Sequence, residues 1–293
     1  MSLQRKGYAC VSRLTGRTTN HDCTLRTATP ERLRALIRQN LDDLRAILEH
    51  NLEHGWLLFR IGSSVIPFGS HPVNRLAWWR EFQSDLTAVG ALIEANGMRV
   101  SFHPGQYTVL NSPDPQIVRR AVAEIKYSAR FLSELGLDAS HKIVIHIGGT
   151  YGDKPAAASR FCETVNGLKS DLRSRLVIEN DERSYTPADA LAVSKRTRLP
   201  VVFDNLHYGA NPGEGDLDGL LKNVFATWRK RDGYPKVHFS SQAAGGRLGQ
   251  HSPNADPTEF KRWIECWTRH GDFDLMLEAK EKDRALLDLE NQL

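Results

Sequence analysis

Two kinds of apolar pattern alternate along the whole chain. Short runs rich in Val, Ile and Phe carry apolar residues at every second position, which is typical of buried strands. Eight such runs are predicted, at 7–12, 56–62, 99–104, 142–148, 175–181, 200–205, 236–241 and 274–280. Between them, apolar residues recur with a helical period, as in 33–47 and 117–132. A proline directly follows a capping residue at four places and predicts helix starts there, at 29–30, 112–113, 186–187 and 256–257.

This alternation predicts an α/β protein built from eight β-α units. Spread over residues 7–280, the units average about 34 residues, and no linker rich in Pro or Ser divides them. A doubly wound open sheet would give the same alternation, but eight even repeats in one domain favour a closed barrel. We therefore expect residues 1–293 to form a single-domain (β/α)8 TIM barrel with its functional site at the C-terminal face.

Six consecutive predicted strands each carry one ionisable residue near their end, between apolar neighbours. Residues i and i+2 share a strand face, so these side chains point into the barrel while their neighbours face the helices. The six are His103, His146, Glu179, Asp204, His238 and Glu278. We expect them to meet at the C-terminal mouth, where the active sites of such barrels are built.

A metal centre is the simplest explanation for this ring of polar groups. Burying a carboxylate without a partner costs several kcal/mol, and a cation would be a common partner for all of these groups. A purely hydrogen-bonded network is the alternative. His207, three residues after Asp204, and His251, in the loop after the seventh strand, bring the set to eight donors. A catalytic ion takes about three or four protein ligands, so eight donors imply two or three ions.

The types of donor atom also indicate which metals and which class of reaction to expect. Imidazole and carboxylate without thiolate suit Mn²⁺ or Zn²⁺ better than Ca²⁺ or copper. Clustered divalent ions activate a water and stabilise the oxygens of a phosphoryl displacement. The residues alone thus favour metal-assisted hydrolysis of a phosphodiester.

Several segments resemble one family of repair enzymes over nearly the whole chain. The segments are FRIGSSVIPFGSHP (59–72), SFHPGQY (101–107), VIHIGG (144–149), VIEND (177–181), FDNLHY (203–208) and KVHFSSQ (236–242). They are similar to the UV damage endonucleases, a TIM-barrel group related to the abasic-site endonucleases of the endonuclease IV type.

The resemblance implies an enzyme that nicks duplex DNA immediately 5′ to UV photoproducts. Cyclobutane pyrimidine dimers and 6-4 photoproducts would be the substrates, abasic sites a secondary one, and the products a 3′-hydroxyl and a 5′-phosphate. Manganese is the metal it implies, with Zn²⁺, Co²⁺ or Mg²⁺ as other candidates. The eight donors match the family's metal ligands, and His207 and His251 depend most on this match. We further expect Glu179 to bridge two ions, because its strand lies between those of His146 and Asp204.

The resemblance also assigns residues around the metals. Gln106 and Tyr107 match a pair that wedges into the duplex at the lesion, although Tyr107 could instead be an aromatic lid on a neighbouring loop. Tyr8, expected on the inward side of the first strand, matches a position near the substrate. The family commonly has Asn four residues later, where this chain has Ser12. His71 matches a histidine beside the cleaved phosphate, as a transition-state stabiliser or as a group that positions its loop.

Three basic residues are further candidates. Lys236 lies two residues before His238 and shares its face, so it is a candidate catalytic group, as a carbamate or as a cation near the scissile phosphate. An ion pair with Asp274 is the alternative. Arg60, inward on the second strand, and Arg247, in the loop at 243–251, are candidate DNA contacts, with ion-paired or solvated roles as alternatives.

Composition excludes several classes of protein. A net charge of +4 over 293 residues only hints at an acidic partner, and no apolar run is long enough to cross a bilayer or to form a signal core. Four scattered cysteines without a CxxC pair indicate neither a disulfide framework nor a thiolate zinc site. We expect a cytoplasmic monomer that acts on damaged double-stranded DNA, without a membrane partner or a nucleotide cofactor. The remaining histidines are expected at the surface or at helix caps: His21, His50, His54, His141 and His270.

Three other functions fit parts of this pattern. An abasic-site endonuclease would share the metal chemistry but recognise a missing base. A sugar isomerase of the same fold class would not need the exposed Gln106–Tyr107 loop. A non-catalytic damage-binding module would bind lesions without cleaving the strand.

Overall fold

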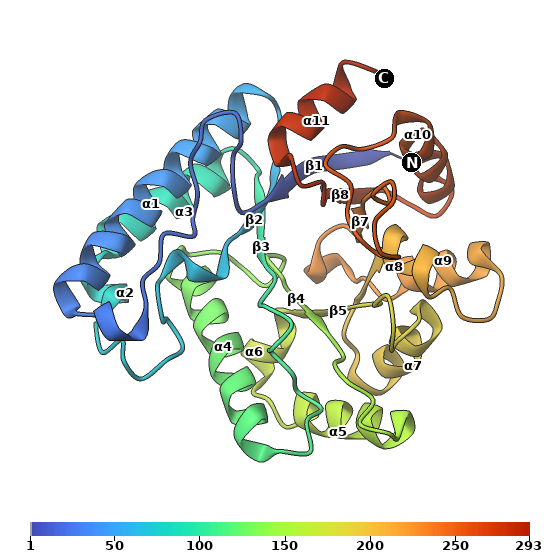
Figure 1. Cartoon of the computed structure of the whole chain (residues 1–293), viewed down its shortest axis with the longest axis horizontal. Coiled ribbons are helices and arrows are strands. Elements are labelled where there is room, and N and C mark those ends of the chain that lie inside the picture. The colour runs from blue at the N-terminus through green and yellow to red at the C-terminus, as the bar shows by residue number, and fades with distance from the viewer. Residues whose placement is uncertain (1) are drawn as a thin grey trace.

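A closed parallel barrel forms the centre of the protein. The computed structural model describes residues 2–293, so Met1 of the expected domain lies outside the described residues. Eight strands pair in chain order, and β8 pairs with β1 to close the barrel (Figure 1). The strands are β1 Leu3–Ala9, β2 Leu58–Ile61, β3 Arg99–Phe102, β4 Ile143–His146, β5 Leu176–Glu179, β6 Val201–Asp204, β7 Lys236–Phe239 and β8 Phe273–Leu277. The predicted (β/α)8 fold is confirmed.

Helices surround the barrel on the outside (Figure 1). They are α1 Pro30–Glu53, α2 Trp78–Glu81, α3 Gln83–Ala95, α4 Pro115–Glu134, α5 Lys154–Asn166, α6 Ser170–Ser174, α7 Pro187–Thr197, α8 Asn205–Ala210, α9 Leu217–Ala226, α10 Pro257–Thr268 and α11 Lys282–Glu290. Short 3-10 turns lie at η1 Leu25–Thr27, η2 Ser63–Val65 and η3 Lys230–Asp232.

Side-chain caps start the main helices where the sequence indicates. Thr29 and Thr186 each accept a hydrogen bond from a backbone N–H in the first turn, directly before a proline. Asp256 caps α10 in the same way. The start predicted at 112–113 is wrong by two residues, because Asp114 rather than Ser112 caps α4, and Pro115 follows it.

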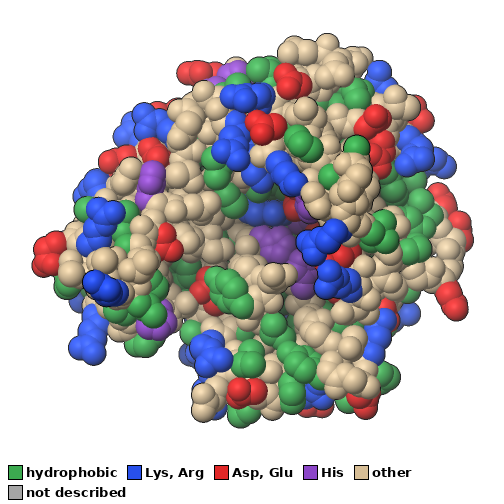
Figure 2. Space-filling view, viewed as in Figure 1, with side chains coloured by type: hydrophobic (Ala, Val, Ile, Leu, Met, Phe, Trp, Pro, Cys, Tyr) green, Lys and Arg blue, Asp and Glu red, His purple; other side chains and the backbone are tan. Residues whose placement is uncertain are grey.

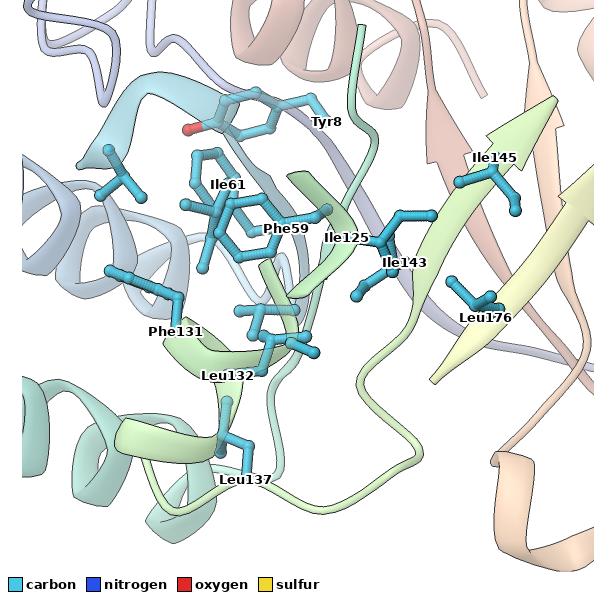
Figure 3. Close-up of a cluster of buried hydrophobic side chains, with 14 of the residues drawn as sticks. Tyr8, Phe59, Ile61, Ile125, Phe131, Leu132, Leu137, Ile143, Ile145 and Leu176 are labelled. Atoms are coloured by element: carbon cyan, nitrogen blue, oxygen red, sulfur yellow. The ribbon is translucent and has the colours of Figure 1, made fainter. Parts of the chain in front are cut away.

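The hydrophobic core lies between the barrel and its helices. Outward residues of the strands, such as Phe59 and Ile61 on β2, pack with Phe131 and Leu132 of α4 (Figure 3). Inward residues form separate layers, and one of them consists of Val144, Val177 and Val202 with Trp228. The alternation of inward and outward residues on β2 to β8 is therefore the one expected from the sequence.

All four cysteines are free. Among residues 2–293, the helices are too short or too polar to cross a lipid bilayer.

Gly7 on β1 provides a test of the barrel packing. A Cβ at this position would lie 1.5 Å from the carbonyl oxygen of Leu58, which belongs to the backbone of the neighbouring strand. Because neither strand can move aside without opening the barrel, Gly7→Ala should lower the free energy of unfolding by about 3 kcal/mol. Chemical denaturation measures this change.

Gly209→Ala is the matched control, because a Cβ there meets nothing within 4 Å. Its effect on unfolding should stay within about 1 kcal/mol. Equal stability of the two variants would contradict the packing described for β1 and β2.

Candidate metal centre

The structure brings six of the predicted donors together at one mouth of the barrel. His146, Glu179, Asp204 and His238 lie on strands β4 to β7, whereas His103 and Glu278 directly follow β3 and β8. Figure 2 shows histidine side chains at the bottom of a hollow in this face, with Lys and Arg side chains above and to the right of it. The mouth is the C-terminal end of the parallel strands, as expected.

Glu179 joins two groups of candidate ligands. Its Oε2 lies 2.9 Å from Nε2 of His103 and 3.6 Å from Nε2 of His146. Its Oε1 lies 2.6 Å from Nδ1 of His238, which is 3.0 Å from Oε1 of Glu278 and 4.0 Å from Oδ2 of Asp204. Within each group the ligand atoms lie within 4.8 Å of one another. The two oxygens of one carboxylate therefore serve two adjacent groups.

His207 and His251 lie at the edge of this arrangement, outside both groups. Nδ1 of His207 is 3.0 Å from the carbonyl oxygen of Asn180, and Nδ1 of His251 is 2.6 Å from that of Glu278. A hydrogen bond from Nδ1–H to a carbonyl leaves Nε2 as the nitrogen that can bind a metal, which is the usual arrangement of a metal-binding histidine. The ring centroids of these two histidines are 6.3 Å apart.

Burial and crowding set the charge states of the mouth. Burial by itself would raise the pKa of Glu179, but the imidazoles of His238 and His146 hold that pKa well below its usual range. Burial together with the carboxylates of Glu179 and Glu278 raises the pKa of Asp204. Burial lowers the pKa of His146 to about 4, so its imidazole is neutral and able to bind a cation at neutral pH.

Two buried side-chain atoms of the candidate ligands have no hydrogen-bond partner. They are Oδ2 of Asp204 and Nδ1 of His146. Buried polar groups are normally satisfied, so these two atoms indicate missing partners. Since Oδ2 of Asp204 belongs to the group of four candidate ligands around His238, a divalent cation fits the residues present.

Two asparagines that the sequence analysis missed hold the ligand strands together. The side-chain amide of Asn180 accepts from N–H of Asp204 at 3.0 Å and donates to its carbonyl at 3.1 Å. Asn205 makes the same pair of bonds with Ser240, whose Oγ lies 2.9 Å from Nδ1 of His251. Each asparagine directly follows a carboxylate donor, and this repeat of acid and Asn is the signal that could have identified them.

Arg60 and Lys236 both point into the barrel, as expected. The guanidinium of Arg60 pairs with the carboxylate of Glu278 and lies 3.1 Å from Nε2 of His238. Lys236 is fully buried, and its Nζ has no hydrogen-bond partner. The alternative ion pair with Asp274 is wrong, because Arg99 takes that carboxylate at 2.8 Å.

A cavity of about 400 Å³ opens beside the ligands. Its lining includes Arg60, Arg247, His251 and Glu278. It also includes two basic residues that were not predicted from the sequence, Lys280 and Lys282, which lie two and four positions after Glu278. A cluster of cations beside the carboxylates suits a polyanionic ligand.

The expected placement of Tyr8 is wrong. Gly7 and Ala9 take the inward positions of β1, so Tyr8 faces the helices, as Figure 3 shows beside Phe59. Its ring is fully buried, and its hydroxyl donates to Oδ1 of Asn51 at 2.7 Å. Tyr8 is therefore a core residue that cannot contact a substrate at the mouth.

Ser12 is also unable to reach a phosphate. It is fully buried, and its hydroxyl donates to the carboxylate of Asp283. One histidine departs from its expected surface position, because His141 is buried and its Nδ1 accepts from N–H of Val100 at 3.1 Å.

Three predicted site residues lie on exposed loops. Tyr107 is 69% exposed, Gln106 is exposed beside it, and His71 is exposed in the loop after β2. Among the interactions of residues 2–293, no hydrogen bond or ion pair links these three to the eight donors. Their roles toward DNA stay predictions.

Known proteins resemble this chain over nearly its whole length. The model of the family described as UV-endonuclease UvdE matches residues 2–293. The UV DNA damage endonuclease of Clostridium perfringens is 40% identical over 292 residues, which cover 98% of this chain and 70% of that protein. The protein of the same name from Bacillus cereus is 35% identical over 264 residues, or 90% of this chain and 83% of that protein.

Solved structures give the same result. The crystal structure of SacUVDE superposes with a TM-score of 0.91 at 35% identity, over 99% of this chain and all of that chain. Endonuclease IV from Thermus thermophilus superposes with a TM-score of 0.59 at 14% identity, over 98% of both chains. D-psicose 3-epimerase from Clostridium cellulolyticum superposes with a TM-score of 0.53 at 17% identity, over 81% of this chain and 80% of that one. At these low identities, the last two comparisons show a similar fold and nothing more.

The family model and these relatives agree with the resemblance seen in the sequence motifs. The chain belongs to the UV-endonuclease UvdE family.

Proposed function

We propose that this protein is a metal-dependent endonuclease that nicks duplex DNA immediately 5′ to UV photoproducts. The products would be a 3′-hydroxyl and a 5′-phosphate. The observation that carries the proposal is the carboxylate of Glu179 shared by two groups of ligands at the mouth of the barrel. Membership in a family of UV endonucleases supplies the substrate class.

Two or three divalent ions, most simply Mn²⁺, would occupy the mouth. His103 and His146 would hold one ion, and Asp204, His238 and Glu278 a second, with Glu179 bridging them. His207 and His251 would complete the set from the edge. When bound, such ions supply an activated water and stabilise the oxygens of the displaced phosphodiester.

The basic side chains of the cavity would hold the DNA backbone. Arg247, Lys280 and Lys282 line it around the candidate ligands, so phosphates on either side of the cut would meet positive charge. Arg60 lies deeper and pairs with Glu278, so it would position that ligand as well as face the phosphate. His71 would approach the cleaved phosphate from the loop after β2.

Gln106 and Tyr107 would fill the space that a damaged dinucleotide leaves in the duplex. Tyr107 is exposed enough to stack on bases, and its ring folds over Gly105, where a Cβ would lie 2.4 Å from Cε1 of the tyrosine. Stacking of an aromatic ring on a base contributes about 1–3 kcal/mol. The loop therefore presents one stacking group and one amide beside the mouth.

Lys236 would carry a carbamate. Its fully buried Nζ has no partner. Burial and the cations of Arg99, Arg60 and Lys142 hold the pKa of its amine well below the usual value, although the carboxylate of Asp274 opposes this effect. The neutral amine would add CO₂ and lose one proton, and the resulting anion would meet these positive groups. Crystals grown with bicarbonate should show density for the three added atoms beyond Nζ, and density that ends at Nζ would exclude the modification.

The central test uses an end-labelled duplex with a single cyclobutane dimer. With Mn²⁺, we expect one cut immediately 5′ to the dimer, and EDTA should abolish it. The same duplex without a lesion is the control, and a duplex with one abasic site tests the secondary substrate. Binding to the dimer without any cut in Mn²⁺ would instead support a damage-binding module.

Removal of the wedge should separate recognition from metal binding. In the Gln106→Ala/Tyr107→Ala variant, the preference for damaged over undamaged duplex should fall about 10- to 100-fold, since base stacking is lost. Metal content measured by mass spectrometry should not change. Tyr234→Ala removes an exposed tyrosine that precedes β7 at the other end of the barrel, and it should keep the preference. Loss of metal in the double variant would contradict the wedge assignment.

The charge of His207 gives metal binding a measurable pH dependence. Burial would lower the pKa of His207, but the carboxylates of Asp204 and Glu179 raise this pKa to about 9. The imidazole is therefore protonated at pH 7.5 in the metal-free protein, and binding of a cation at Nε2 must release that proton.

Calorimetry in buffers of different ionisation enthalpy measures this release. At pH 7.5 the wild type should release about one proton more per chain than His207→Gln, and the difference should shrink as the pH approaches 9. Equal proton release by both proteins at pH 7.5 would show that His207 is not a ligand.

A further inference from the structure

The last turn of α1 carries a second cluster of metal-binding side chains, far along the chain from the donors of the mouth. His50, Glu53 and His54 follow one another at positions i, i+3 and i+4 and share one helix face. Each offers one ligand atom, and the three atoms lie within 4.8 Å of one another. From the sequence, these histidines were expected only as separate residues at the surface or at helix caps.

One hydrogen bond and one stacking contact orient His54 for metal binding. Its Nδ1 lies 3.0 Å from the carbonyl oxygen of His50, one turn earlier in the helix. With the proton on Nδ1, Nε2 has a free lone pair. The ring also stacks on Trp56, at 4.4 Å between centroids and an interplanar angle of 25°, which restricts its rotation.

The surroundings of His50 favour the complementary tautomer. Its Nε2 is buried without a hydrogen-bond partner and faces Oδ2 of Asp283 at 4.0 Å. A proton on Nε2 is attracted to that carboxylate, so Nδ1 is left as the acceptor. Nδ1 lies 3.9 Å from Oε2 of Glu53, on the side where the cluster forms. A carboxylate behind the distal nitrogen is a frequent support of metal-binding histidines.

The C-terminal end of α1 provides an electrostatic field that favours a cation, and one side of the cluster is open to solvent. The carbonyl groups at the C-terminus of a helix carry partial negative charge, which stabilises cations there. The side chain of Glu53 is 75% exposed, whereas that of His50 is 16% exposed. Three ligands with one side open to water match the coordination of a tetrahedral zinc site that keeps a water.

We propose that His50, Glu53 and His54 form a separate site for one divalent transition-metal ion of the Zn²⁺ or Ni²⁺ type. Two imidazoles and one carboxylate select these ions over Mg²⁺ and Ca²⁺, which require more oxygen ligands. The bound ion would tie the last turn of α1 together where it meets Trp56 and Asp283. The site belongs to the outer layer of helices and shares no residue with the mouth of the barrel.

The experiment counts Ni²⁺ bound to the full-length Mn²⁺-loaded protein by equilibrium dialysis and mass spectrometry. The wild type should bind one Ni²⁺ per chain more than His54→Gln, and Glu53→Gln should bind this ion more weakly than the wild type. Glu49→Gln is the matched control, since Glu49 lies one turn earlier and pairs with Arg45 outside the cluster. This control should bind as many ions as the wild type. Equal counts in the wild type and His54→Gln would overturn the proposal.

Two further readouts separate this site from the proposed endonuclease. Ni²⁺ should quench tryptophan fluorescence in the wild type, and Trp56→Phe should remove this quenching while the ion count stays the same. His54→Gln should nick dimer-containing duplex at the wild-type rate. A parallel loss of nicking in His54→Gln would show that the cluster is part of the endonuclease site and would overturn its independence.

Discussion

Three carboxylates confined to one mouth of the barrel are the constraint on which the rest of the site depends. Glu179, Asp204 and Glu278 lie close together where little water reaches them. Burial of like charges at this spacing costs several kcal/mol for each group unless positive charge compensates. His238 and Arg60 supply part of that charge, but Oδ2 of Asp204 still has no partner. Divalent cations would meet this need, and the same cations would provide the chemistry of the proposed reaction.

The barrel holds this costly arrangement rigid by anchoring it to strands. Asn180 and Asn205 each pair with the backbone of the next strand, and carbonyl groups fix the rings of His207 and His251. Valines on the inward faces of β4, β5 and β6 fill the layer below. Several groups proposed to meet DNA, such as Tyr107 and Arg247, lie instead on loops, whereas Arg60 lies on β2. The rigid candidate ligands are therefore largely separate from the loops proposed to contact DNA.

The alternation of inward and outward residues along the strands was enough to predict the barrel and the positions of six candidate ligands. It works because a buried parallel strand has only two faces, so an ionisable residue between apolar neighbours must point inward. The same argument failed for Tyr8. On β1 the small residues Gly7 and Ala9 point inward, and the aromatic ring takes the larger space beside the helices. A pattern of polarity contains no information about this difference in available volume.

The sequence could not predict which residues from distant parts of the chain pair with one another. Lys236 and Asp274 are neighbours in register, as the alternative ion pair requires, yet Arg99 from β3 takes the carboxylate. Arg60 and Glu278 are 218 positions apart, and only closure of the barrel brings them together. The cluster of His50 and His54 was visible as a spacing, but its significance depends on Asp283, which a distant part of the chain supplies, and on the stacking of His54 on Trp56.

The shared role of Glu179 can be observed directly in crystals soaked with Mn²⁺. Anomalous diffraction at the manganese edge should show at least two peaks at the mouth, one beside His103 and His146 and one beside Asp204, His238 and Glu278. Each peak should lie within coordination distance of a different oxygen of Glu179. A single peak, or two peaks of which only one contacts Glu179, would contradict the bridged centre.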